Sequence, residues 1–102
     1  MNSKALSLMG MARRANRVSL GHDACESAVK SGSASLVITS CDASQRLKEE
    51  MAGLCENYNT DYFELDCTKF DLGAALGAKI TAVLSIDDAG FAKRITELIR
   101  EE

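Results

Sequence analysis

The stretch that decides the fold is ARRANRVSLGHDACESAVKSG, residues 12–32. Its pattern predicts the end of one helix, a short strand and a second helix in direct succession. Gly21 permits a sharp turn from strand to helix, His22 or Asp23 can cap that helix, and Gly32 stands where the helix must end. A helix N-terminus presents unpaired backbone N–H groups and partial positive charge. With three arginines just upstream, this turn is expected to form a phosphate-binding corner.

On either side of this stretch, apolar runs and amphipathic segments alternate along the chain. Strands are expected at residues 17–20, 35–39, 61–65 and 82–86, and helices at 3–13, 22–31, from 42 to about 58, at 69–76 and after 88. Strands that alternate with helices imply crossover connections, so we predict a three-layer α/β/α sandwich with a four-stranded sheet, either mixed or largely parallel. The 102 residues suffice for one core, so residues 1–102 are expected to form a single domain.

Three of the later helices begin with side chains that can cap them. The expected caps are Asp42 with Gln45, Thr68 with Asp71, and Asp87 with Asp88. The third helix is expected to bury Leu47, Met51, Leu54, Cys55 and Tyr58, and the last helix Phe91, Ile95, Leu98 and Ile99. Gly73 interrupts a helical pattern at a cost of about 1 kcal/mol against alanine, which predicts a close approach of another backbone.

Charge is distributed unevenly along the chain. The formal net charge is -3. Residues 1–32 nevertheless hold five basic and two acidic residues, whereas residues 33–102 hold seven basic and 13 acidic residues. An acidic protein with a basic N-terminal third can present one polyanion-binding face, although the remaining charge weakens long-range steering. A solvated basic turn, with Arg13 and Arg14 at a helix C-terminus, explains the same residues without a ligand.

The four cysteines, Cys25, Cys41, Cys55 and Cys67, are 16, 14 and 12 residues apart. None has the close spacing of a zinc-ligand pair or a redox dithiol, and each falls in or beside an apolar run. They are therefore expected to be small core residues in a reducing compartment. Because no leader or long apolar span is evident, we expect a soluble, cytoplasmic protein with no membrane contact, metal or cofactor.

A nucleotide-binding site and a catalytic site are the two alternatives to a polyanion-binding corner. A nucleotide site would need a glycine-rich phosphate loop directly after a strand, but Gly21 is alone in its turn and residues 72–77, LGAALG, fall within a predicted helix. Catalysis would need an activated nucleophile or a pair of tuned acid–base groups. His22 could pair with Glu26, but a capping histidine with a surface ion pair accounts for both, so we infer neither an enzyme nor a small-molecule substrate.

Several segments together resemble the L-seven-Ae/L-thirty-e ribosomal protein family, and within it the small bacterial stand-alone members found with translation genes. The resemblance spans nearly the whole chain and rests on LMGMARRA (8–15), GHDACESAVKSG (21–32), LVI (36–38), DAS (42–44), LGAALG (72–77) and AVLSI (82–86). It implies an α/β/α fold and binding to a kink-turn, an RNA internal loop with tandem sheared G·A pairs and a sharp bend. The family binds this RNA with the start of its second helix and the loop before its last strand.

Three of four recognition positions differ from the family's pattern. Carried over by position, the turn glycine is Gly21, the asparagine is Asp23, the glutamate is Ala24 and the lysine is Ser27. An ionised Asp23 only accepts hydrogen bonds and brings negative charge toward phosphates. Loss of the lysine removes one phosphate contact. Such a contact would contribute about 0.9 to the slope of log K against log salt concentration. Kink-turn binding is therefore expected to be weakened or redirected.

The chemistry of this corner suggests roles for several of its residues. Arg13, Arg14 and Arg17 would contact phosphates, and the backbone at Gly21 and His22, with the Asp23 side chain, would meet base edges. Ile80 would lie against an unstacked base, or else simply pack within its loop. The full expected set is Arg13, Arg14, Arg17, Gly21, His22, Asp23, Ala24, Ser27, Lys30, Lys79, Ile80 and Thr81.

The sequence thus predicts non-enzymatic binding of structured RNA, either ribosomal RNA or a ribonucleoprotein, in association with the ribosome or translation. The alternative is a protein-interaction module on the same fold. The acidic remainder of the chain and the changed recognition positions are compatible with that alternative.

Overall fold

The computed structural model describes residues 3–101, and these contain five helices and four strands in the predicted order. The elements are α1 (Ser3–Arg14), β1 (Val18–Leu20), α2 (His22–Lys30), β2 (Leu36–Ser40), α3 (Gln45–Asn57), β3 (Asp61–Leu65), α4 (Lys69–Ala75), β4 (Val83–Ile86) and α5 (Ala89–Arg100). Each expected element is present, with ends that differ by a few residues. The predicted α/β sandwich is therefore confirmed.

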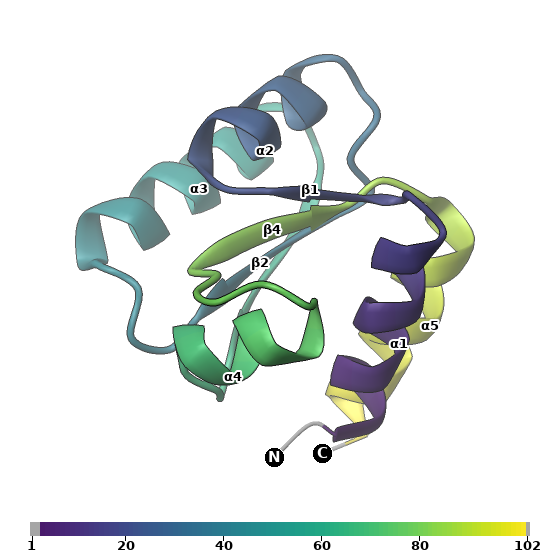
Figure 1. The fold of residues 1–102 in the computed structure, drawn as a ribbon. Helices are drawn as coiled ribbons and strands as arrows, with labels where there is room; N and C mark the ends of the chain where they lie inside the picture. The colour runs from purple at the N-terminus through teal and green to yellow at the C-terminus, as the bar shows by residue number, and fades with distance from the viewer. Residues whose placement is uncertain (1–2, 102) are drawn as a thin grey trace.

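The four strands form one mixed sheet in the order β1-β4-β2-β3. β2 and β3 are parallel, whereas β4 runs antiparallel to both of its neighbours, β1 and β2, so the sheet is mixed and not largely parallel. Because β1, β2 and β3 all point the same way, the helices that follow them all begin at one end of the sheet (Figure 1). β4 begins at that end as well. We call this end, formed by the starts of α2, α3, α4 and β4, the helix-start end.

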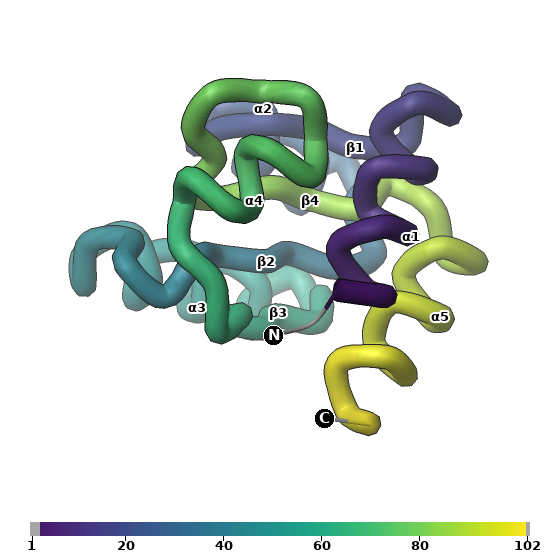
Figure 2. The backbone as a smooth tube through the Cα atoms, turned by 60° about the horizontal axis from the view of Figure 1, so that its bottom comes forward, coloured from purple at the N-terminus to yellow at the C-terminus, as the bar shows by residue number. Residues whose placement is uncertain are grey.

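Helices cover both faces of the sheet: α2 and α3 lie on one, and α1, α4 and α5 lie on the other (Figures 1 and 2). Side chains alternate along each strand, so Val37 joins the core cluster that contains Met51 of α3, whereas Ile38 joins the cluster that contains Met9 of α1. Every residue of β2 and β4 is buried, as expected for central strands covered on both sides.

All four cysteines are free thiols, as predicted. Cys25, Cys55 and Cys67 are buried in the core, and Cys41 is half-buried. Burial raises the pKa of Cys25 to about 12 and the pKa values of Cys55 and Cys67 to about 11 each. Within residues 3–101 no three His, Cys, Asp or Glu side chains cluster as metal ligands would, and none of the helices described could span a membrane.

The helix caps confirm two predictions and overturn three. The side chains of Thr68 and Asp88 accept hydrogen bonds from the backbone of Asp71 and Phe91, at 3.1 and 2.8 Å. By contrast, α3 is capped by Ser44 and not by Asp42, whose carboxylate accepts from the Lys69 N–H at 2.9 Å. Asp87 does not cap α5, because its carboxylate accepts from the hydroxyls of Ser19 and Ser85. At α2 the N-cap is Gly21, and neither His22 nor Asp23 caps this helix.

The expected inward faces of α3 and α5 are largely correct. Met51, Cys55, Ile95 and Leu98 are buried, and Leu47, Leu54, Phe91 and Ile99 are half-buried. Tyr58 was expected in the core but is 48% exposed. It lies beyond the last residue of α3, where the backbone has left the helical conformation, so it no longer continues the apolar stripe.

The close backbone approach predicted at Gly73 is confirmed. A Cβ atom on Gly73 would lie 2.8 Å from the Lys79 carbonyl oxygen and 2.9 Å from the Ile80 nitrogen. Two backbone bonds fix the same contact, from the Ala78 N–H to the Gly73 carbonyl at 2.8 Å and from the Thr81 N–H to the Lys69 carbonyl at 2.9 Å. The loop between α4 and β4 therefore lies directly on α4, and this sets where the loop residues point.

Candidate nucleic-acid interface

The start of α2 forms the centre of the candidate site. Gly21 turns the chain from β1 into α2 with a φ of 91°, in the region that favours glycine. In the described structure no side chain caps α2, and the N–H groups of His22, Asp23 and Ala24 have no backbone acceptor. Asp23, Ala24 and Ser27 are exposed at spacings that place them on one stripe of the helix. This surface offers hydrogen-bond donors and partial positive charge to a ligand.

The loop between α4 and β4 lies beside the start of α2. The Gly21 N–H donates to the carbonyl of Val83, the first residue of β4, at 3.1 Å, and Val83 directly follows the loop. Lys79 and Ile80 are exposed, and Ile80 is 55% exposed. Thr81 is buried, so its side chain is not available to a ligand, contrary to the sequence-based expectation. Two segments about 60 residues apart are thus brought together at the helix-start end (Figure 2).

Carboxylates surround His22, and the sequence did not reveal one of them. The imidazole hydrogen-bonds through Nδ1 to Asp23 at 3.1 Å and through Nε2 to Glu50 of α3. The pKa of His22 is raised above its ordinary value, chiefly by the bond to Glu50 and next by the bond to Asp23. Glu26, whose spacing would also allow a pair with His22, forms a surface ion pair with Lys30 at 3.6 Å. No signal within the sequence relates Glu50 to His22, because the two residues meet only when α3 packs beside α2.

The basic residues do not gather at one corner as the sequence suggested. Arg13 donates from Nη1 to the Leu76 carbonyl at 2.8 Å and so joins the end of α1 to the end of α4. Arg14 is exposed on the same turn and lines a groove beside Ala75. Both arginines therefore lie where the α4–β4 loop begins, and Lys79 follows in the same loop.

Arg17 and Lys30 lie farther from the start of α2. Arg17 precedes β1, with its carbonyl accepting from the Asp87 N–H, so the whole strand separates it from Gly21 by about 13 Å. Lys30 ends α2, about 12 Å along the helix from its first residue. The expectation of one basic corner is wrong for these two residues, because an extended strand and a helix carry their ends apart.

The chain matches the family model described as "Ribosomal protein L7Ae/L30e/S12e/Gadd45 family" over residues 3–96. The chain belongs to this family. It is 28% identical over 92 residues to the RNA-binding protein YlxQ of Bacillus subtilis (strain 168), which covers 90% of this chain and 91% of that protein. It is 31% identical over 96 residues to the RNA-binding protein YlxQ of Enterococcus faecium, with 94% and 91% covered.

Solved structures also match the chain. A protein of unknown function from Bacillus halodurans C superposes with a TM-score of 0.90 at 33% identity, covering 95% of this chain and 97% of the other. The Giardia lamblia 15.5kD RNA binding protein superposes with a TM-score of 0.82 at 23% identity, covering 98% and 86%. At 23% identity, the second match shows only that the two proteins share a fold. The resemblance inferred from sequence motifs is therefore confirmed at the level of family and fold.

Proposed function

We propose that this protein binds structured RNA with the helix-start end, using the beginning of α2 and the α4–β4 loop together. Membership of the family and the names of the YlxQ relatives support RNA as the ligand. The observation that carries the proposal is the bond from the Gly21 N–H to the Val83 carbonyl, since it holds the two segments side by side.

The geometry suits a bent or partly unpaired RNA. The free N–H groups at the start of α2 can donate to phosphate oxygens or base edges. Lys79 within the loop, and Arg14 beside the end of α4 where the loop begins, can neutralise phosphates. Unpaired bases expose edges and faces that a duplex hides, so an exposed apolar side chain such as Ile80 gains a contact only with that kind of RNA. Recognition of this kind needs no bond-breaking step, and we propose a non-enzymatic role without cofactor or small-molecule substrate.

The carboxylates of Asp23 and Glu50 set this member apart from a strongly basic RNA-binding protein. They lie on either side of His22 at the start of α2, where an approaching phosphate would meet them. Repulsion between like charges lowers affinity for the phosphate backbone more than affinity for base edges. We therefore propose that the protein favours an RNA whose bases, and not only its phosphates, face the start of α2.

The decisive measurement compares binding to a kink-turn RNA and to a straight duplex of equal length, each at two salt concentrations. We expect preference for the kink-turn, and a loss of that preference in Gly21→Val, because a β-branched residue does not tolerate a φ of 91°. Gly32→Val places the same strain after α2, away from the site, and controls for general destabilisation. No binding to either RNA at low salt would overturn the proposal.

We also propose where the activity belongs in the cell. The ligand is ribosomal RNA or another ribonucleoprotein RNA, and the protein acts in the cytoplasm in association with translation. Support comes from the ribosomal proteins in its family. Crosslinking the protein to RNA in cells and sequencing the bound fragments tests this assignment, and recovery of only messenger fragments at random positions would contradict it.

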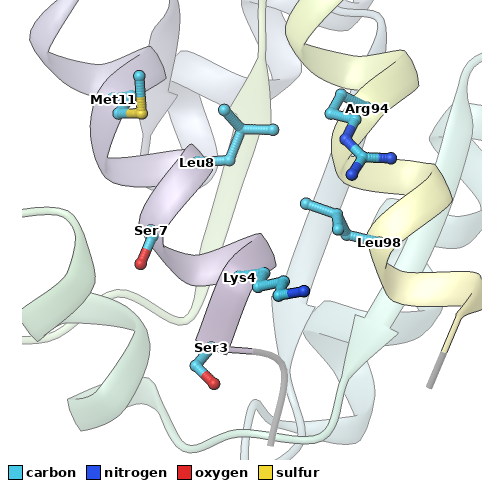
Figure 3. Close-up of a pocket in the computed structure, with 7 residues that line it drawn as sticks. All are labelled: Ser3, Lys4, Ser7, Leu8, Met11, Arg94 and Leu98. Atoms are coloured by element: carbon cyan, nitrogen blue, oxygen red, sulfur yellow. The ribbon is translucent and has the colours of Figure 1, made fainter.

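A second candidate function, a protein-interaction module, is favoured by a groove between α1 and α5. Leu8 and Leu98 point toward one another across it, and Lys4 and Arg94 reach in from the two helices (Figure 3). The groove has a volume of about 410 Å³, and Met11 at its edge is 51% exposed. Leu8→Glu would abolish a protein contact here and leave RNA binding unchanged, which separates this candidate from the first.

A further inference from the structure

An exposed aromatic ring lies at the helix-start end outside the residues assigned so far. Phe70, in the first turn of α4, is 58% exposed. A large apolar side chain left in water forgoes burial worth about 2 kcal/mol, so its exposure beside a candidate ligand site calls for an explanation. The folded core does not supply one, because Leu72 and Leu76 are the residues by which α4 packs inward.

Phe70 and Ile80 lie on adjoining surfaces. Phe70 and Gly73 are three residues apart on α4 and thus neighbours on its surface. Ile80 crosses α4 at Gly73, where its backbone nitrogen is 2.9 Å from the position of a Cβ atom. The absence of a side chain at Gly73 therefore lets the loop bring Ile80 next to the turn that carries Phe70. Together the two exposed side chains form an apolar patch on α4 and its loop, at the helix-start end where α2 also begins.

Two lysine ammonium groups lie beside this apolar patch. The Lys69 ammonium lies 5.7 Å from the centroid of the Phe70 ring, a cation–π arrangement that occupies one side of the ring. Lys79 is exposed next to Ile80. An apolar surface flanked by ammonium groups matches a nucleotide, which offers a flat base and a negative phosphate. An apolar segment of a protein partner would leave both charges without counterparts.

We propose that Phe70 is a stacking platform for one unpaired base of the bound RNA, with Ile80 against the edge of that base. The inference rests on the proposed function, since it extends the same interface from the start of α2 to the start of α4. The ring presents its free face to the base. Stacking tolerates any base, so this subsite adds affinity and favours unpaired RNA without adding strong sequence preference.

The test uses a kink-turn RNA with 2-aminopurine placed at each unpaired nucleotide in turn, because stacking on a ring changes the fluorescence of this base. We expect one position to change on binding to the natural protein, and Phe70→Ala to remove that change and weaken binding about 5- to 100-fold. Phe70→Trp should restore both, whereas Phe70→Leu should restore neither. Tyr58→Ala is the matched control, because Tyr58 is 48% exposed at the end of α3, away from the helix-start end.

The outcomes separate this inference from the proposed function. If the natural protein binds the kink-turn RNA, and Gly21→Val abolishes binding while Phe70→Ala does not weaken it, the proposed function stands and the stacking subsite is wrong. If Phe70→Leu binds as tightly as the natural protein, the ring acts only as an apolar surface and the inference is likewise overturned. If the natural protein binds neither RNA, both proposals fail together.

Discussion

His22 links α2 to α3 through a charge that depends on pH. Its pKa is raised chiefly by the hydrogen bond to Glu50, so a proton binds more tightly in the folded protein than in the unfolded chain. The stabilisation from this proton is therefore fully present below the unfolded value of 6.5 and is lost as the pH rises through the folded pKa. Because the imidazole is well exposed to solvent, we expect the effect on stability to be small.

The partner of His22 can be tested by titration. We expect Glu50→Gln to lower the pKa of His22 toward its ordinary value, because the main acceptor loses its charge. The chain has one histidine, so its imidazole signals in an NMR titration need no assignment. Glu56→Gln removes a carboxylate from the same helix farther from His22 and should leave the titration unchanged. An unshifted pKa in Glu50→Gln would show that the hydrogen bond does not form in solution.

Residue burial also predicts which thiol reacts first. Since the thiolate is the nucleophile, burial that raises the pKa of Cys25 to about 12 and blocks access should leave it unreactive in the native protein. Cys41 is only half-buried and should be alkylated by iodoacetamide before the other three. Mass spectrometry of peptides after timed alkylation measures the order. In denaturant the differences should disappear, and early native alkylation of Cys25 would contradict this account of the core.

At the scale of elements, the contact between α4 and the α4–β4 loop is the one most sensitive to change. Gly73→Ala would place a Cβ atom 2.8 Å from the Lys79 carbonyl oxygen, so the loop or the helix must move. We expect a loss of about 1–3 kcal/mol in the free energy of unfolding, together with weaker RNA binding as Lys79 and Ile80 are displaced.

Gly53 provides the matched control for this prediction. It is an exposed helical glycine in α3, and a Cβ atom there would meet no other atom within 4 Å. Gly53→Ala should therefore stabilise the protein by about 0.5–1 kcal/mol, because alanine loses less conformational entropy in a helix. Urea unfolding of both variants measures the difference. Similar effects in the two variants would mean that the close approach at Gly73 is absent in solution.

At the scale of the whole molecule, the distribution of charge limits how RNA is bound. The net charge of -3 and the dispersal of the arginines leave few cations for phosphates at the helix-start end. We therefore expect binding to weaken only modestly with salt, and Arg14→Gln to reduce the slope of log K against log salt by about 0.7–0.9. Lys93→Gln, on α5 and away from the site, should leave the slope unchanged. Equal slopes for Arg14→Gln and the natural protein would remove Arg14 from the interface.

The sequence by itself determined the order of the elements and much of their local chemistry. Apolar, β-branched runs marked β2 and β4 as buried strands, Thr68 marked the start of α4, and Gly73 marked the close approach of a backbone. These features depend on periodicity, capping and backbone space, which act between residues close in the chain. The family resemblance rested on the same local segments.

Only the tertiary structure decided which of these features meet. It separated Arg17 and Lys30 from Gly21, buried Thr81, and placed Glu50 against His22. It also brought Phe70 and Ile80 to the same end of the sheet as α2. Strand order and direction determine which helix ends become neighbours, and they follow from the packing of the whole core. No spacing along the chain encodes such contacts, because each joins residues that the folded sheet alone brings together.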